Sequence, residues 1–294
     1  PGDLRPWQDE VVAQRRFDLE VCHPNDVSEG SLKKAALVLV DFKIQHWPER
    51  ANAPALALRP ANGLAVLAVL QEAAFELAPT KARAFALYTA VIQDVARELV
   101  HQPHIVARAH NLEWVFEKNG AGNAQDERVR RVAALAGAVA ALPAKWPGDD
   151  PSTAAAALQT WLALQGDVPW CDAAWRAVRR CRPPIHEFAE HTLGTGVVRW
   201  ALHKVLPYPT FLVDDAHLAA RLRVSLESLR AAVASEEFGK VFDAVEYRGA
   251  LSLFLGRRWW RAGVEHVLYE ATADSPGGPG RSSRSPQRAD SRPR

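Results

Sequence analysis

The chain has 294 residues, and 48% of them are hydrophobic, which is enough for two domains of ordinary size with a substantial core. A net charge of +2 gives no electrostatic argument for binding nucleic acid or membranes. The three cysteines are odd in number and widely spaced, which is typical of a reduced cytoplasmic protein rather than a disulfide scaffold. No signal peptide or apolar stretch of membrane length is visible, so we expect a cytoplasmic protein without a membrane partner.

Helical and strand-like segments alternate through the first 142 residues. The pattern predicts a helix over residues 4–16, a strand over residues 17–22 and a short helix within residues 25–35, with Ser28 as its N-cap. Two short apolar runs, 37–41 and 84–89, then predict buried strands, because they are rich in Val, Leu and aromatic residues. A third strand is predicted at 112–116, and the helices that separate and follow the three strands are 62–75, 93–111 and 125–142. Such alternation predicts an α/β fold with a doubly wound parallel sheet.

The composition changes after residue 142. Residues 143–152 are rich in Pro and Asp, which is typical of a linker. Residues 153–273 contain many helical runs and no convincing pair of strands, so we expect a second, all-α domain. Residues 274–294 consist mainly of Gly, Ser, Pro and Arg, which predicts a disordered basic tail. The chain is therefore predicted to contain two domains, 1–142 and 153–273.

Polar side chains stand at the ends of the three predicted strands. Asp41 directly follows Leu37-Val38-Leu39-Val40, Thr89 ends the second strand, and Lys118 follows the third. The carboxyl ends of adjacent parallel strands meet at one edge of a sheet, so these side chains are expected to lie together. A carboxylate, a hydroxyl and an ammonium group suit reversible phosphorylation of the carboxylate, with the lysine pairing to the phosphoryl oxygens and the hydroxyl reorienting toward them. An aspartate that simply begins a turn is the alternative.

Residues 1–142 resemble the receiver domain of bacterial two-component response regulators. The resemblance rests on the segment that ends at Asp41, on Asn62-Gly63-Leu64, on Leu87-Tyr88-Thr89-Ala90, and on Trp114-Val115-Phe116-Glu117-Lys118. It implies a flavodoxin-like sheet with the strand order 2-1-3-4-5. It also implies that Asp41 accepts phosphate from a histidine kinase, that Thr89 is the switch hydroxyl, and that Lys118 pairs with the phosphate.

The chain departs from the receiver pattern at its start. A receiver opens with a strand that ends in two acidic residues, which hold the Mg²⁺ needed for phosphoryl transfer, whereas this chain opens with Pro1-Gly2-Asp3-Leu4. Without that central strand, apolar core and backbone polar groups would be exposed. We therefore weigh two hypotheses. Either the natural chain carries the strand and the acidic pair upstream of Pro1, and with them the Mg²⁺ site, or this is a degenerate receiver that another segment completes.

The segment 218–229 in the second half resembles a helix-turn-helix. In this interpretation Ser225 caps the second helix, while Ser228 and Arg230 face a DNA major groove. Arg223 occupies the turn position that glycine normally takes. Two ordinary helices that meet at a serine cap are the alternative. DNA is therefore one candidate partner of this protein.

Residues 256–263 are the most unusual part of the second half, because arginine and tryptophan alternate there. If these side chains are exposed, they form a surface of the kind that anchors a protein partner, since Trp and Arg dominate binding hot spots. In the alternative, the tryptophans pack in the helical core and the arginines extend outward. The residues concerned are Arg257, Arg258, Trp259, Trp260 and Arg261.

Five cysteine and histidine residues within the segment 169–203 have side chains that could bind zinc. Their spacing fits no tight cysteine-pair pattern, so no metal site is assigned to them, and buried thiols with surface histidines are the simpler interpretation. These residues are Cys171, Cys181, His186, His191 and His203.

The leading hypothesis is a cytoplasmic signalling protein like a response regulator. Its first domain would accept phosphate at Asp41 and modulate the helical domain, which would contact an unidentified protein partner. The alternatives are a pseudo-receiver that only binds protein and a DNA-binding transcriptional regulator. An independent enzyme has little support, since the sequence shows no well-spaced nucleophile–base pair and no glycine-rich phosphate loop.

Overall fold

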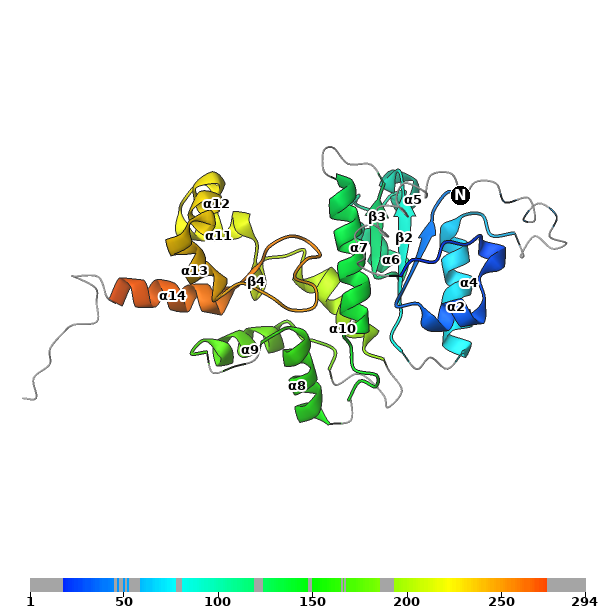
Figure 1. Ribbon diagram of the computed structural model, residues 1–294. Coiled ribbons are helices and arrows are strands. Elements are labelled where there is room, and N and C mark those ends of the chain that lie inside the picture. Colours follow the sequence, from blue (N-terminus) through cyan, green and yellow to red (C-terminus); the bar gives the residue numbers. More distant parts are fainter. Residues whose placement is uncertain are drawn as a thin grey trace, which may run out of the picture.

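The structure is a computed structural model, and it describes residues 18–44, 47, 50, 52, 59–77, 81–118, 124–147, 150–164, 166, 168–185 and 193–273. The described residues combine a three-stranded parallel sheet with many helices, so the protein has a mixed α/β fold, as predicted. Figure 1 shows an elongated molecule with the sheet near one end and the last helix at the other. The predicted helix 4–16 and the predicted tail 274–294 lie outside the described residues.

The sheet contains three parallel strands in the order β1-β2-β3. Their bounds are Leu37–Asp41 for β1, Ala84–Thr89 for β2 and Trp114–Glu117 for β3. The central strand β2 is buried along its whole length, because strands cover both of its edges and helices both of its faces. All residues of β1 are partly exposed, since β2 is its one partner among the described strands. The prediction of a fully buried strand before Asp41 is therefore wrong: among the described strands, β1 lies at the edge of the sheet.

Helices cover both faces of the sheet. On the face of Phe85 and Leu87 lie α2 (Glu29–Lys34), α4 (Gly63–Glu76), α5 (Ile92–Ala96) and α6 (Pro103–Ala109). On the face of Ala86 and Phe116 lies α7 (Ala124–Ala140). Right-handed crossovers that all advance in one direction place α4 and the α5–α6 pair on the same face.

Side-chain caps begin α2 and α4, and the cap at Ser28 is the predicted one. The Ser28 hydroxyl accepts a hydrogen bond from the Ser31 amide at 3.0 Å, and the Asn62 side chain accepts one from the Leu64 amide at 3.0 Å. Gly63 follows Asn62 because a Cβ at this position would overlap the backbone carbonyl of Asp41. Glycine therefore lets α4 start directly against the end of β1.

Two predicted elements differ from the structure. Residues 18–22 form neither helix nor strand, because no described strand lies beside them to pair with their backbone. The predicted helix 93–111 is two helices, α5 and α6. Arg97 has a φ of 51°, which ends α5, and Pro103 lacks an amide hydrogen and so begins a new helix rather than continuing one.

The second half is mostly helical. It also contains two short strands, β4 (Leu212–Val213) and β5 (Trp259–Trp260), which pair in antiparallel fashion, so the all-α prediction is corrected. Strands of two residues are too short for an alternating pattern to reveal them. The helices are α8 (Pro151–Trp161), α9 (Cys171–Arg180), α10 (Thr195–Trp200), the π-helical η4 (Ala201–Val205), α11 (Asp215–Leu222), α12 (Leu226–Ala234), α13 (Glu236–Asp243) and α14 (Arg261–Ala273).

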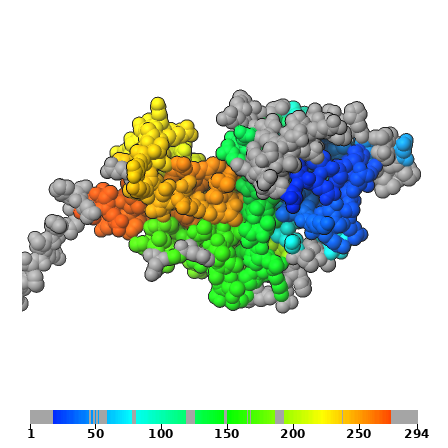
Figure 2. All heavy atoms as spheres, viewed as in Figure 1, coloured from blue at the N-terminus to red at the C-terminus, as the bar shows by residue number. Residues whose placement is uncertain are grey.

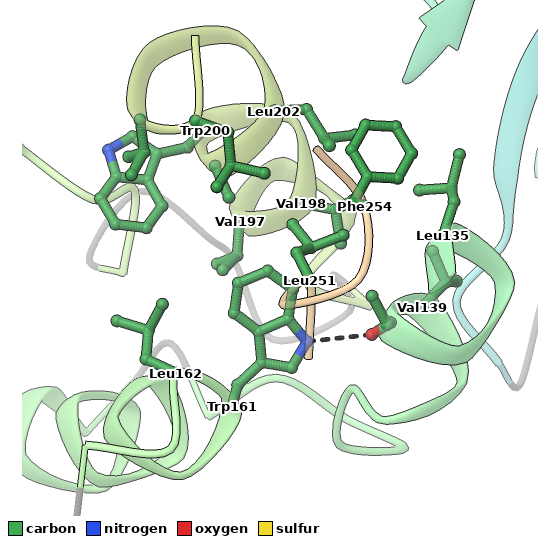
Figure 3. Packing of buried hydrophobic residues seen from close by; sticks show 14 of the residues in the cluster. Leu135, Val139, Trp161, Leu162, Val197, Val198, Trp200, Leu202, Leu251 and Phe254 are labelled. Atoms are coloured by element: carbon green, nitrogen blue, oxygen red, sulfur yellow. Dashed lines mark hydrogen bonds between the residues drawn. The ribbon is translucent and has the colours of Figure 1, made fainter. Parts of the chain in front are cut away.

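One hydrophobic cluster connects the sheet to this helical half. Figure 3 shows Leu135 and Val139 of α7 together with Trp161 of α8 and Phe254, and the Trp161 indole donates a 2.9 Å hydrogen bond to the carbonyl of Ala138. Trp146, within the predicted linker 143–152, is fully buried in the same cluster. In Figure 2 the green residues of the middle of the chain fill the centre of the molecule. The domain boundaries remain a prediction.

None of the helices in the described part of the chain is both long enough and apolar enough to cross a membrane.

Candidate functional site

The structure brings Asp41 and Lys118 into direct contact at the carboxyl edge of the sheet. Asp41 ends β1, and Lys118 follows β3 on the far side of β2. The Lys118 ammonium passes over the Tyr88 ring, 5.1 Å from its centroid, and lies 2.6 Å from Asp41 Oδ2. The Lys118 and Asp41 side chains are 23% and 30% exposed, so the ion pair is shielded on one side and open to solvent on the other.

Thr89 lies at the same edge, with its hydroxyl engaged by its own chain. The hydroxyl donates to the Val91 carbonyl at 3.0 Å and accepts from the Val91 amide at 3.2 Å. The Thr89 carbonyl accepts a hydrogen bond from the Lys118 amide at 2.6 Å. The three predicted residues therefore stand at the ends of three adjacent strands, and a side-chain interaction joins Asp41 to Lys118.

Backbone hydrogen bonds fix the turn that follows Asp41. The Phe42 amide donates to the Tyr88 carbonyl at 2.8 Å, and the Phe42 carbonyl accepts from the Gly63 amide at 2.9 Å. The Asp41 carboxylate itself accepts a hydrogen bond from the Lys43 amide at 3.3 Å. One Asp41 oxygen thus faces the local backbone, while the other faces Lys118.

Tyr88 and Arg128 are neighbours of the site that the sequence analysis did not assign. Burial raises the pKa of the Tyr88 phenol, and the nearby Asp41 carboxylate raises it further. The Arg128 guanidinium donates a hydrogen bond to the phenol and opposes this rise. Arg128 belongs to α7. The sequence placed it in a predicted helix, but no sequence pattern indicated that it lies near Asp41. A second cation therefore stands near the Asp41–Lys118 pair.

A buried carboxylate lies at the amino-terminal ends of the strands, opposite the Asp41–Lys118 pair. Glu113 directly precedes β3 and is fully buried. Its carboxylate accepts hydrogen bonds of 2.5 Å from the Phe85 amide and from Arg199 of α10, and Arg199 also bonds to Asn111. Burial raises the pKa of Glu113, and the Arg199 charge opposes that rise. The signal in the sequence was a single charge within the apolar run 112–116.

His203, in the π-helical turn, extends this buried group. Its Nε2 lies 2.9 Å from the carbonyl oxygen of Glu113, and burial lowers the pKa of His203 to about 4. Glu113, Arg199 and His203 together attach the helical half to the sheet. We call these three residues the Glu113 cluster.

The predicted aromatic anchor at residues 257–261 is corrected by the structure. Trp259 and Trp260 are 1% and 2% exposed, because the pairing of β4 with β5 places them in the core. The rings of Trp260 and Phe211 stack with centroids 5.6 Å apart. The alternative interpretation, tryptophans inside and arginines outward, describes the segment: Arg257 is exposed, while Arg258 and Arg261 are partly exposed.

The predicted helix-turn-helix contains two helices joined at the expected cap. The Ser225 hydroxyl accepts a hydrogen bond from the Ser228 amide at 3.0 Å and begins α12. Arg223 adopts the left-handed conformation, with a φ of 56°, at the turn position. Arg230 lies 3.4 Å from Asp215 in an exposed ion pair. DNA binding by Ser225, Ser228 and Arg230 remains a prediction.

The candidate zinc ligands are not gathered around one point in the part of the chain that the structure describes, which contains no group of three metal-binding side chains. Cys171 and Cys181 are free thiols whose pKa burial raises. His186 and His191 lie outside the described residues.

Comparisons of the chain with protein-family models, curated proteins and solved structures find no match.

Proposed function

We propose that this protein is a receiver-like signalling protein in which Asp41 accepts a phosphoryl group. The observation that carries the proposal is the 2.6 Å contact between Lys118 and Asp41, made across the central strand at the carboxyl edge of a parallel sheet. Functional groups of open α/β sheets gather at this edge. The consecutive strand order, with helices on both faces, also fits the last three strands of a flavodoxin-like sheet.

The proposed reaction uses Asp41 as the nucleophile. A carboxylate oxygen of Asp41 forms a bond to the phosphorus atom, and the bond between phosphorus and the donor atom breaks. When the donor is a histidine kinase, this donor atom is a nitrogen of the phosphorylated histidine. Lys118 then pairs with the phosphoryl oxygens, to which it is already adjacent. The Thr89 hydroxyl exchanges its hydrogen bond to the Val91 carbonyl for one to the phosphoryl group, and this exchange is the switch.

The receiver resemblance implies a Mg²⁺ ion beside the phosphoacceptor, and such an ion needs several oxygen ligands. Within the described residues, Asp41 belongs to no group of three possible metal ligands, and Asp94 is paired with Lys43 at 2.5 Å. The described residues therefore do not form a Mg²⁺ site by themselves.

The test is incubation of the purified chain with a small phosphodonor such as acetyl phosphate, with and without Mg²⁺, followed by intact mass spectrometry. We expect the mass of one added phosphoryl group, and its loss in Asp41→Asn. Lys118→Ala should reduce the modified fraction at least about tenfold, because it removes a charge-assisted contact to the phosphoryl group. Asp94→Asn, a change at a nearby acid on α5, is the matched control and should leave the modification intact.

A folded wild-type chain that stays unmodified under all these conditions would favour the second candidate, a pseudo-receiver that acts only by binding protein. The observation on its side is that, among the described residues, Asp41 belongs to no group of three side chains that could hold a metal ion.

A further inference from the structure

A groove of about 360 Å³ separates α2 from α4. Apolar side chains from both helices and from the turn before α2 line it. The two helices lie side by side at the end of the molecule opposite α14, away from the helical half (Figure 1). The apolar residues of the lining are Val27, Leu32, Leu70, Ala73 and Leu77.

Helix α4 is apolar on nearly every side, including the side away from the sheet. Val69 is 62% exposed and stands one helical turn before Ala73, so it lies on the helix surface next to a residue that lines the groove. Phe75, on another side of the same helix, is 80% exposed. A helix on the surface of a globular protein normally turns polar residues to solvent, and a continuous exposed apolar area marks an interaction site.

The charged residues that line the groove are both acidic. Glu29 stands on the α2 side and Glu76 on the α4 side, and exposed Glu72 follows Val69 by one turn. Helix α4 contains no lysine or arginine. Lys33 lies 3.4 Å from Glu29, but both side chains are mostly exposed, so this pair holds the carboxylate weakly.

We propose that this groove binds an amphipathic helix of a partner protein. Apolar side chains of that helix, spaced at i, i+3 and i+7, enter between α2 and α4, and its flanking lysines or arginines meet Glu29 and Glu76. A stable dimer buries roughly 800 Å² on each subunit. Because α2 is only six residues long, the groove is better matched in size to a single helix than to an interface of that area.

The test uses synthetic helical peptides with a leucine stripe, one with lysines on its polar face and one with glutamates. We expect the Leu/Lys peptide to bind the full chain with micromolar affinity by isothermal titration calorimetry, and the Leu/Glu peptide to bind at least about tenfold more weakly. Glu76→Lys and Val69→Asp should each weaken Leu/Lys binding at least about fivefold. Glu227→Lys, at an exposed acid of α12, is the matched control and should bind like the wild type.

Equal binding of the two peptides, or binding that Glu76→Lys and Val69→Asp leave unchanged, would overturn the proposal. Sedimentation velocity of the chain alone tests the other occupant: a dimer that Val69→Asp dissociates would assign the groove to a second copy of this chain instead. Val69 and Glu76 are exposed, so circular dichroism should show that both variants remain folded.

Discussion

At the scale of single residues, burial distinguishes the two ion pairs at opposite edges of the sheet. Asp41 and Lys118 are 77 positions apart in the chain and meet where solvent reaches both, so their contact contributes about 1 kcal/mol or less to stability and is free to rearrange. Glu113 is fully buried beneath Arg199, where loss of one partner leaves an uncompensated charge. The open pair suits chemistry, and the buried pair suits attachment.

The Glu113 cluster leads to a stability prediction. Arg199→Met should lower the free energy of unfolding by about 3–5 kcal/mol, because it leaves the Glu113 carboxylate buried without its counter-charge. Lys118→Met, the same type of change at the open pair, should cost about 1 kcal/mol or less. Urea denaturation at neutral pH measures both. Similar losses for the two variants would contradict the assignment of their roles.

The lowered pKa of His203 leads us to expect that the stability of the protein depends on pH. Its pKa is about 4 in the folded protein and 6.5 without burial, so the unfolded chain binds the extra proton between these values. Stability contributed by neutral His203 is therefore complete above pH 6.5 and falls as the pH drops toward 4, by about 1.4 kcal/mol per pH unit. The raised pKa of Glu113 acts in the opposite direction, because the folded protein then retains a proton more readily.

Comparison with His203→Gln isolates the histidine, since Glu113 is common to both chains. The stability of the wild type relative to this variant should decline between pH 6.5 and 4 in urea titrations. A constant difference across that interval would show that His203 does not titrate as its burial requires.

At the scale of elements, close approach of α4 to β1 shapes the candidate site. Gly63→Ala should cost about 1–3 kcal/mol, because its Cβ would overlap the Asp41 carbonyl and push α4 away from the strand. Gly137→Ala in α7 is the matched control: no atom lies within 4 Å of its Cβ, so better helix propensity should stabilise the protein by up to about 1 kcal/mol. Denaturant melts of the two variants should shift in opposite directions.

The predicted elements differ in how much local information they carry. Helices α2, α4 and α7 and strand β2 follow the predicted pattern closely, because their caps and periodicity lie within the segments themselves. The position of strand β1 agrees with the prediction, but its burial does not. Burial depends on whether other strands pair with both of its sides, and the sequence of β1 does not specify this. The pairing of Leu212–Val213 with Trp259–Trp260 joins segments too short and too far apart for any local pattern.

At the scale of the whole molecule, the sheet and the helical half share one core. Arg131 of α7 lies over the Phe254 ring, 5.3 Å from its centroid, while Trp114 meets the same ring edge-on at 5.0 Å. Contacts of this kind connect residues on both sides of the predicted linker. We therefore expect the described parts to unfold as one cooperative unit.

Phe254→Ala tests this expectation. It should lower the free energy of unfolding by about 3–5 kcal/mol, and the loss should appear both in amides of β2 and in amides of α10 when hydrogen exchange is followed by mass spectrometry. Loss of protection in α10 alone, or two separate thermal transitions in the wild type, would instead indicate independent domains.

Local sequence patterns are enough to predict the alternation of helices and strands, the caps at Ser28 and Ser225, and the three polar residues at strand ends. All of these depend on neighbours within a few positions, whose periodicity and hydrogen-bonding groups are local properties. Only the tertiary structure decided that Lys118 contacts Asp41, that Glu113 needs Arg199, and that Trp259 and Trp260 are buried. These outcomes depend on which distant segments exclude water from one another, and no local pattern specifies that.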